Sequence, residues 1–280
     1  MAVRRNNYKR EEVNIMEVWK PVTELGKKVK TGEITDIDQI FASKERILEP
    51  EIVDVLLPNL KSDLLLIGQA KGKFGGGQRR IFRQTQKKTR EGNRIQFATC
   101  ALVGNSNGYV GVAFGKSKET VPARDKSLRR AKLNLIKIRR GCGSWEGVAN
   151  ANSIPFAVTG KCGSSKVTLI PAPEGTGLCI EKECAKILSA AGIEDIWSKT
   201  LGQTKTKVNL IKACVDALKR LSEVKIQPTH ITSLGIKEGK LPLGPSTEDL
   251  EIMLPKGTET ETKVSKEVKE KKAVEEVVKE

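Results

Sequence analysis

Residues 97–117 read FATCALVGNSNGYVGVAFGKS, and their pattern predicts a β-hairpin. An apolar run from Phe97 to Val103 and an alternating run from Tyr109 to Phe114 are typical of two strands. The residues between them, 104–108, are GNSNG. Glycine and asparagine tolerate the positive φ angles of tight turns, so we expect the chain to reverse there.

The segments on either side extend this hairpin into a sheet with a helix. We expect another strand over residues 79–87 and a basic loop over residues 87–94. A helix is predicted over residues 119–138, because apolar side chains recur at helical spacing at Leu128, Ala131, Leu135 and Ile138. Gly141 is expected to end that helix. The segment thus follows a β-β-β-α order, which places the chain in the α+β class.

The positive charge of the chain is concentrated in the same segment. The 280 residues include 50 Lys and Arg against 34 Asp and Glu, a formal net charge of +16. Residues 71–140 hold 19 of these basic residues and three acidic ones, so their net charge is also +16 and the remainder is neutral. Such segregation causes self-repulsion unless an anionic partner neutralises it. A solvated basic face without a partner is the alternative; no lipidation signal or amphipathic helix with a broad apolar face supports a membrane.

The rest of the chain divides into three parts by composition and pattern. Residues 1–60 are expected to be an N-terminal extension with a helical pattern at Ile37, Ile40 and Phe41. Residues 61–141 form the basic domain and residues 142–235 a second domain. Residues 236–280 are a C-terminal extension, in which residues 256–280 are expected to be disordered or transiently helical.

The second domain is predicted to mix strands and helices. Strands are expected over residues 156–159, 166–171 and 194–199, and a helix over residues 182–191 ending at Gly192. A last helix has one apolar stripe, formed by Leu210, Ala213, Cys214, Ala217, Leu218 and Leu221. That stripe assigns Cys214 to the core.

Catalytic and metal chemistry find little support in the sequence. The chain has one histidine, His230, and six scattered cysteines without a C-x-x-C pair, so we predict no metal and no cofactor. Residues 111–117 (GVAFGKS) imitate a phosphate-binding P-loop, but the interval between the glycines is one residue too short. Their alternation is also typical of a strand, which would commit the backbone amides to a sheet.

Two glycine-rich segments leave alternatives open. Residues 71–80 (KGKFGGGQRR) suit either a backbone approach to an anion or a flexible linker. Gly175-Thr176-Gly177 precedes a helix, so it is either a seat for an anion or, as we favour, a tight turn.

Six motifs in order resemble a known family, the universal small-subunit ribosomal protein five, called small-subunit protein two in eukaryotes. The motifs are residues 88–97 (KTREGNRIQF), 103–111 (VGNSNGYVG), 115–119 (GKSKE), 138–141 (IRRG), 170–177 (IPAPEGTG) and 191–193 (AGI). Residues 140–146 (RGCGSWE) and the N-terminal extension resemble archaeal members. Asn93 departs from the family pattern, which usually has a basic residue or glycine there.

The resemblance implies a fold and a function. It implies a first domain similar to the double-stranded-RNA-binding fold and a second domain with a left-handed β-α-β crossover. It implies a structural, non-enzymatic protein of the cytoplasmic small ribosomal subunit that binds 16S-type rRNA. Its neighbours would be small-subunit ribosomal protein four and messenger RNA at the channel through which messenger enters, with an influence on decoding accuracy and subunit assembly.

Charge and resemblance together select the candidate site residues. The expected RNA-binding residues are Lys71, Lys73, Arg79, Arg80, Arg83, Lys87, Lys88, Arg90, Arg94, Lys116, Lys118, Arg129, Arg130, Lys132, Arg139 and Arg140. The resemblance further implies a protein–protein interface at Glu174, Gly175, Thr176 and Gly177. The competing hypothesis is a soluble RNA-directed enzyme or phosphotransferase that uses Gly175–Gly177 of the second domain at a phosphate.

Overall fold

The first sheet is built around one long strand, β3, whose inner half is buried and whose outer half is exposed. The computed structural model describes residues 19–43, 45–70, 77–143, 151–239 and 241–242. The elements of this sheet are β1 (Lys61–Leu65), β2 (Arg83–Thr89), β3 (Gly92–Gly104), β4 (Tyr109–Ser117), α5 (Thr120–Leu133) and β5 (Leu135–Lys137). β1 and β2 pair with successive parts of one edge of β3, and β4 pairs with the other edge.

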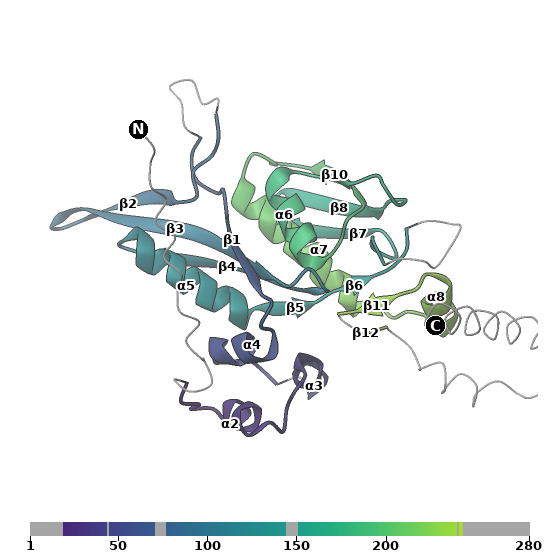
Figure 1. Cartoon of the computed structure of the whole chain (residues 1–280). Coiled ribbons are helices and arrows are strands. Elements are labelled where there is room, and N and C mark those ends of the chain that lie inside the picture. Colours follow the sequence, from purple (N-terminus) through teal and green to yellow (C-terminus); the bar gives the residue numbers. More distant parts are fainter. Residues whose placement is uncertain (1–18, 44, 71–76, 144–150, 240, 243–280) are drawn as a thin grey trace, which may run out of the picture. The chain divides into compact units, whose positions relative to one another are not determined.

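The second sheet carries two long helices (Figure 1). Its elements are β7 (Val158–Cys162), β8 (Ser165–Pro171), β9 (Leu178–Cys179), α6 (Lys182–Ala191), β10 (Ile196–Leu201) and α7 (Lys207–Glu223). The strand order is β7-β8-β10-β9, with β9 parallel to β10 and the other pairs antiparallel. A small third sheet follows α8 (Pro228–Ser233) and joins β6 (Arg139–Arg140), β11 (Lys237–Glu238) and β12 (Leu241–Pro242).

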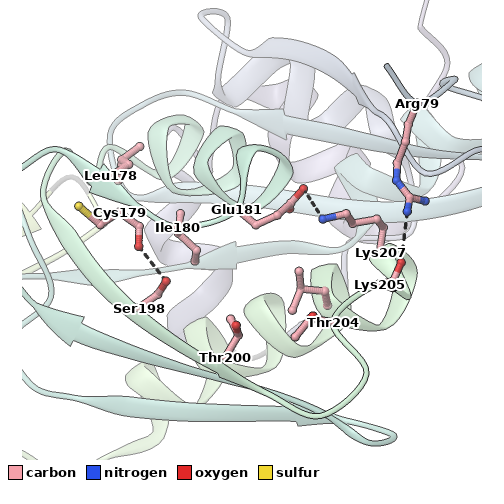
Figure 2. Close-up of a pocket in the computed structure, with 11 residues that line it drawn as sticks. Arg79, Leu178, Cys179, Ile180, Glu181, Ser198, Thr200, Thr204, Lys205 and Lys207 are labelled. Carbon is pink, nitrogen blue, oxygen red and sulfur yellow. Dashed lines mark hydrogen bonds and ion pairs between the residues drawn. The ribbon is translucent and has the colours of Figure 1, made fainter. Parts of the chain in front are cut away.

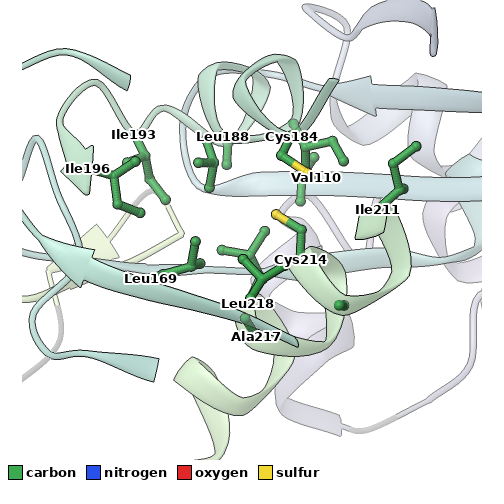
Figure 3. Packing of buried hydrophobic residues seen from close by; sticks show 14 of the residues in the cluster. Val110, Leu169, Cys184, Leu188, Ile193, Ile196, Ile211, Cys214, Ala217 and Leu218 are labelled. Atoms are coloured by element: carbon green, nitrogen blue, oxygen red, sulfur yellow. The ribbon is translucent and has the colours of Figure 1, made fainter. Parts of the chain in front are cut away.

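The two larger sheets share one hydrophobic core. Cys100 and Leu102 of β3 and Val110 of β4 belong to the same buried cluster as the apolar faces of α6 and α7. Figure 3 shows Val110 beside Cys184 of α6 and Cys214 of α7. Burying apolar surface is the main favourable term in folding, so this cluster joins the two halves of the protein.

The hairpin and most elements of the second domain are confirmed. The turn over residues 105–108 places Ser106 at φ 57° and Gly108 at φ 87°, as the asparagine–glycine pattern predicted. α6 has the predicted bounds, and Gly192 ends it at φ 81°. All six residues of the predicted α7 stripe are buried. The mixed helix and sheet confirm the α+β class.

The helix after β4 ends earlier than predicted. α5 stops at Leu133, and the predicted stripe residue Leu135 lies in β5, which pairs with β4. The buried face of α5 consists of small residues, Ala123, Ser127 and Ala131, of which only Ala131 belongs to the predicted stripe, while Leu128 is half-buried. Small side chains are needed because the helix lies directly on two glycines of β4. Gly141 does not end this helix; its amide donates to the carbonyl of Ser153 at 2.9 Å.

The strand before the hairpin is also shifted from its prediction. β2 begins at Arg83 rather than Arg79, and it continues to Thr89 through part of the predicted basic loop. Only Arg90 and Glu91 lie between β2 and β3. The alternation rule missed this extension because every residue from Arg83 to Lys88 is exposed, so no apolar period marks the strand.

The N-terminal extension contributes α2 (Glu24–Thr31), α3 (Ile37–Ser43) and α4 (Pro50–Leu56), of which only α3 was predicted. Ile37 of α3 lies in one buried cluster with Tyr109 of β4 and Leu135 of β5. The Tyr109 hydroxyl donates to Asp38 at 2.6 Å, and the Phe41 ring stacks on the Tyr109 ring at 6.2 Å between centroids. The extension is therefore packed on the first sheet.

The contact between α5 and β4 makes a stability prediction. A Cβ added at Gly115 would lie 2.4 Å from the Ala123 carbonyl oxygen and 2.7 Å from the Ser127 amide nitrogen. We expect Gly115→Ala to lower the free energy of unfolding by about 1–3 kcal/mol, because backbone atoms must move to admit the methyl group. Ser117→Ala, on the same strand, serves as the control and should change it by less than about 0.5 kcal/mol. Equal denaturation midpoints for the two variants would contradict this packing.

Candidate nucleic-acid interface

The outer parts of β2 and β3 form a two-stranded ribbon, visible at the left of Figure 1. Residues 83–96 are called the arm from here on. β4 pairs with β3 only from Phe97 onward, so residues 92–96 of β3 pair with β2 alone. Every arm residue except Thr89 is exposed. At the tip, the Thr89 hydroxyl donates to the Gly92 carbonyl at 2.7 Å, and Gly92 adopts φ 108°, a conformation that glycine tolerates.

The cations of the arm gather on one of its two faces. In the strand register, Lys87 lies directly opposite Arg94, and Arg83 lies opposite Ala98, whose other neighbour is Lys116 of β4. Side chains alternate between faces along a strand, so Arg83, Lys87, Arg94 and Lys116 point to the same side. These four residues are the basic face.

Nothing in the described structure neutralises the basic face. The arm has five basic residues and one acidic residue, Glu91 at its tip. Within the described residues, no ion pair involves Arg83, Lys87, Arg94 or Lys116. Like charges directly opposite each other on neighbouring strands are destabilising. The opposite face has Lys88, but its neighbours Asn93 and Ile95 are uncharged.

Several further candidate residues are exposed and have no side-chain partner within the described residues. They are Arg80, Lys88, Arg90, Lys118 and Arg129. Lys71 and Lys73 lie outside the described residues. Lys88 lies in β2 and Arg129 in α5, whereas Arg80, Arg90 and Lys118 lie in the segments that precede or connect these elements. All five belong to the part of the chain that holds the excess charge.

Other candidate cations are partly used inside the protein. Lys132 forms an ion pair with Asp54 at 2.6 Å, and Arg139 forms one with Glu238 at 3.6 Å. The Arg130 guanidinium donates to the carbonyl of Phe114 at 3.2 Å, although the residue is exposed. These contacts hold the N-terminal helices, the third sheet and α5 to their neighbours, so they compete with any external anion.

Arg79 lies in a polar cavity of about 620 Å³ between the start of α7 and β9 (Figure 2). Its guanidinium donates to the carbonyls of Gly68 at 3.3 Å and Lys205 at 3.4 Å. Lys207 in the same cavity forms an ion pair with Glu181 at 2.9 Å. Arg79 and Lys207 thus already have partners, whereas the exposed Lys205, which also lines the cavity, forms no ion pair within the described residues.

Arg140 does not fit a surface contact, which corrects its place among the candidates. The residue is only 9% exposed. Its guanidinium donates to the Asn107 side-chain oxygen at 2.8 Å and to the carbonyls of Gly239 at 3.0 Å and Gly192 at 3.5 Å. Desolvation lowers the pKa of this guanidinium from its ordinary value. Arg140 therefore links the hairpin turn, the end of α6 and the third sheet.

The loop at Glu174–Gly177 is a turn held by a buried carboxylate. Gly175 and Gly177 adopt φ 84° and 72°, and the Thr176 hydroxyl donates to the Pro173 carbonyl at 2.8 Å. The Gly177 amide donates to Asp195 at 2.7 Å. Because a carboxylate already occupies that amide, the geometry favours the tight turn over the anion seat.

The P-loop-like segment and two of the cysteines are parts of the folded core. Residues 111–117 lie in β4, whose amides belong to the sheet, as predicted. Burial, the largest cause, raises the pKa of the Cys100 thiol to about 12, and a hydrogen bond with Cys214 together with burial raises the pKa of Cys184. Within the described ranges, no three His, Cys, Asp or Glu residues are placed to hold a metal. No helix there is long and apolar enough to cross a bilayer.

Comparison with known proteins identifies both halves of the chain. Residues 81–139 match the ribosomal protein S5 N-terminal domain, and residues 160–229 match the ribosomal protein S5 C-terminal domain. Small ribosomal subunit protein uS5 of Nanoarchaeum equitans is 49% identical over 230 residues, which cover 82% of this chain and 98% of the relative. The protein of the same name from Thermoplasma acidophilum is 44% identical over 226 residues, covering 80% and 96%. That of Methanococcus maripaludis strain C6 is 43% identical over 226 residues, covering 80% and 92%.

These matches decide between the two hypotheses. They cover the arm, α5 and most of the second domain, and the matched relatives are all named as small-subunit ribosomal proteins. The hypothesis of an RNA-directed enzyme is therefore wrong. The chain belongs to the ribosomal protein S5 family, whose members are structural and not enzymatic.

Proposed function

We propose that the chain is a structural protein of the cytoplasmic small ribosomal subunit and that it binds rRNA through the basic face of the arm. One observation carries the proposal, the cross-strand pair of Lys87 and Arg94 on an exposed ribbon with no opposing carboxylate. Cβ atoms of directly opposed residues are about 4.5–5.5 Å apart. A phosphate backbone bound along this face would attract both cations and so offset the repulsion between Lys87 and Arg94.

The chemistry of the basic face suits an RNA backbone better than base edges. Arg83 and Arg94 present planar guanidinium groups that bind phosphate oxygens in a bidentate manner, whereas Lys87 and Lys116 act as point charges. A-form RNA is recognised chiefly by its shape and through its phosphates and 2′-hydroxyls. The arm is two strands wide and exposed on both faces, so it can lie against folded RNA along its length.

The finer architecture and the partners of the chain are also part of the proposal. Three strands followed by α5 resemble the double-stranded-RNA-binding fold, and β9, α6 and β10 provide the parallel β-α-β unit of a second domain with a left-handed crossover. We assign residues 61–141 to the first domain and residues 142–235 to the second; the two family matches lie inside these bounds.

The family resemblance also supports a proposal for the position of the chain within the subunit. On this resemblance, we propose that the turn from Glu174 to Gly177 faces small-subunit ribosomal protein four. Asp195 holds the shape of the turn through its hydrogen bond with the Gly177 amide. We also propose that the chain lies near the channel through which messenger RNA enters, and that it influences decoding accuracy and subunit assembly. Arg80, Lys88, Arg90, Lys118 and Arg129 are also exposed, and we include them in the proposed RNA-binding set.

A salt titration tests the arm directly. We expect the variant Arg83→Gln/Lys87→Gln/Arg94→Gln to bind a full-length small-subunit rRNA transcript with a log-log salt slope that is about two to three units shallower than that of the wild type. Each neutralised phosphate releases counterions, so each lost cation reduces the slope by somewhat less than one unit. The measurement is the dissociation constant at five or more salt concentrations.

The matched control removes the same charge elsewhere. Lys20, Lys27 and Lys28 are exposed residues of the N-terminal extension, and Lys20→Gln/Lys27→Gln/Lys28→Gln should leave the slope at the wild-type value. An arm variant that kept the wild-type slope would contradict the proposed function.

For Arg140 we predict an effect on folding stability and none on RNA binding. Arg140→Lys retains the positive charge but cannot reach all three oxygens that the guanidinium contacts, so some buried acceptors lose their donor. We expect the free energy of unfolding to fall by about 1–3 kcal/mol and the rRNA salt slope to stay unchanged. A shallower slope with unchanged denaturant stability would return Arg140 to the RNA-contacting set.

A further inference from the structure

A second cationic surface lies in the second domain, where α7 passes beside β4. The hollow between these elements has a volume of about 290 Å³ and is called the α7 groove from here on. Val112 and Phe114 of β4 line it on one side, and Lys161, Lys212 and Lys219 line it on the other. None of these three lysines is among the RNA-binding residues that the sequence predicts.

The three lysines of the α7 groove are exposed and come from two elements. Lys212 and Lys219 lie seven residues apart on α7, and therefore on one side of that helix. Lys161 lies on β7. The Lys212 ammonium lies 5.4 Å from the centroid of the Phe114 ring, a cation–π contact that holds it over the groove.

The one carboxylate that lines the groove is already neutralised. Asp216 accepts the backbone amide of Lys161 at 3.0 Å and forms an ion pair with Arg220 at 3.1 Å. Within the described residues, Lys161, Lys212 and Lys219 form no ion pair. The hydrogen bond from the Lys161 amide to Asp216 also links β7 to α7. The groove therefore keeps a surplus of positive charge.

Strand register connects the groove to the basic face. Val112, Phe114 and Lys116 alternate with the glycines under α5, so they lie on the same face of β4. Phe114 pairs with Cys100, and the next position on that face is the row Lys116, Ala98 and Arg83. Lys87 and Arg94 lie four residues farther along the strands. At about 3.3 Å per residue, the six residues of β3 from Cys100 to Arg94 span about 20 Å.

We propose that the α7 groove is a second rRNA-binding site, in which Lys161, Lys212 and Lys219 hold backbone phosphates of an RNA segment that continues from the basic face of the arm. This inference rests on the proposed function of the arm. Two observations favour RNA over a protein partner: the groove continues a cationic face, and its apolar floor is partly covered by the Lys212 side chain. Lysines with mobile stems are suited to an anion that is recognised by charge alone.

Three matched variants of the full-length chain test the proposal. The groove variant is Lys161→Gln/Lys212→Gln/Lys219→Gln, the arm variant is Arg83→Gln/Lys87→Gln/Arg94→Gln, and the control is Lys20→Gln/Lys27→Gln/Lys28→Gln. The probe is a full-length small-subunit rRNA transcript, titrated at several salt concentrations. We expect the groove variant to lower the log-log slope by about two to three units, the arm variant to do so independently, and the combined variant to show the sum of the two changes.

The outcomes separate this inference from the proposed function. A groove variant with the wild-type slope, beside an arm variant with a reduced slope, would overturn the groove as an RNA site and leave the arm intact. Wild-type slopes for both would overturn the proposed function as well. A groove variant that binds the transcript normally but is poorly incorporated into small subunits would assign the groove to a protein neighbour and overturn the RNA assignment. The variant Lys161→Gln/Lys219→Gln keeps the contact between Lys212 and Phe114. We expect it to lower the slope by about one to two units. Such a result would exclude lost packing at Phe114 as the cause of the change.

Discussion

Like charges placed opposite each other on an exposed ribbon are the constraint on which this structure depends. Lys87 and Arg94 repel each other across the arm, and the arm itself has almost no buried surface with which to offset that repulsion. Its stability comes instead from the inner half of β3, where every residue from Ala98 to Gly104 is buried. β3, a strand of 13 residues, thus has its C-terminal half in the core and its N-terminal half in the arm. The buried half therefore fixes the direction in which the arm extends.

The core in turn depends on close packing around β3 and β4. Gly111 and Gly115 let α5 lie directly on one side of the sheet, while Cys100, Leu102 and Val110 share a core with α6 and α7 on the other side. Because both sides of the inner sheet are covered, a basic residue of this segment is either exposed outside the packed region or buried against polar groups of the protein. Those beyond the packed region, such as Arg83 and Lys87, are exposed to solvent, whereas Arg140 is buried at the junction and holds carbonyl oxygens. Position in the packing, rather than residue type, separates the exposed cations, which we propose to bind RNA, from the structural ones.

The same distinction explains what the sequence could and could not reveal. The α7 stripe and the glycine after α6 are local signals, and both were correctly interpreted. The end of α5 was misjudged because Leu135 continues the helical period but pairs with β4, a contact that only the tertiary structure supplies. β1 and the N-terminal helices α2 and α4 were missed because they are short and are stabilised by distant partners, such as Glu49, which accepts hydrogen bonds from Trp19 and Thr23. Counting charge by segment located the arm, but it concealed the α7 groove, since Lys161, Lys212 and Lys219 lie in a part of the chain whose net charge is zero.

Residue-resolved protein–RNA crosslinking in assembled small subunits tests the central claim most directly. The account predicts crosslinks from the arm, at Arg83, Lys87 and Arg94, to backbone positions of small-subunit rRNA, and none from the buried Arg140. The claim that the arm binds rRNA would be contradicted if, in particles that contain the full-length chain, the arm crosslinked only to neighbouring proteins or not at all.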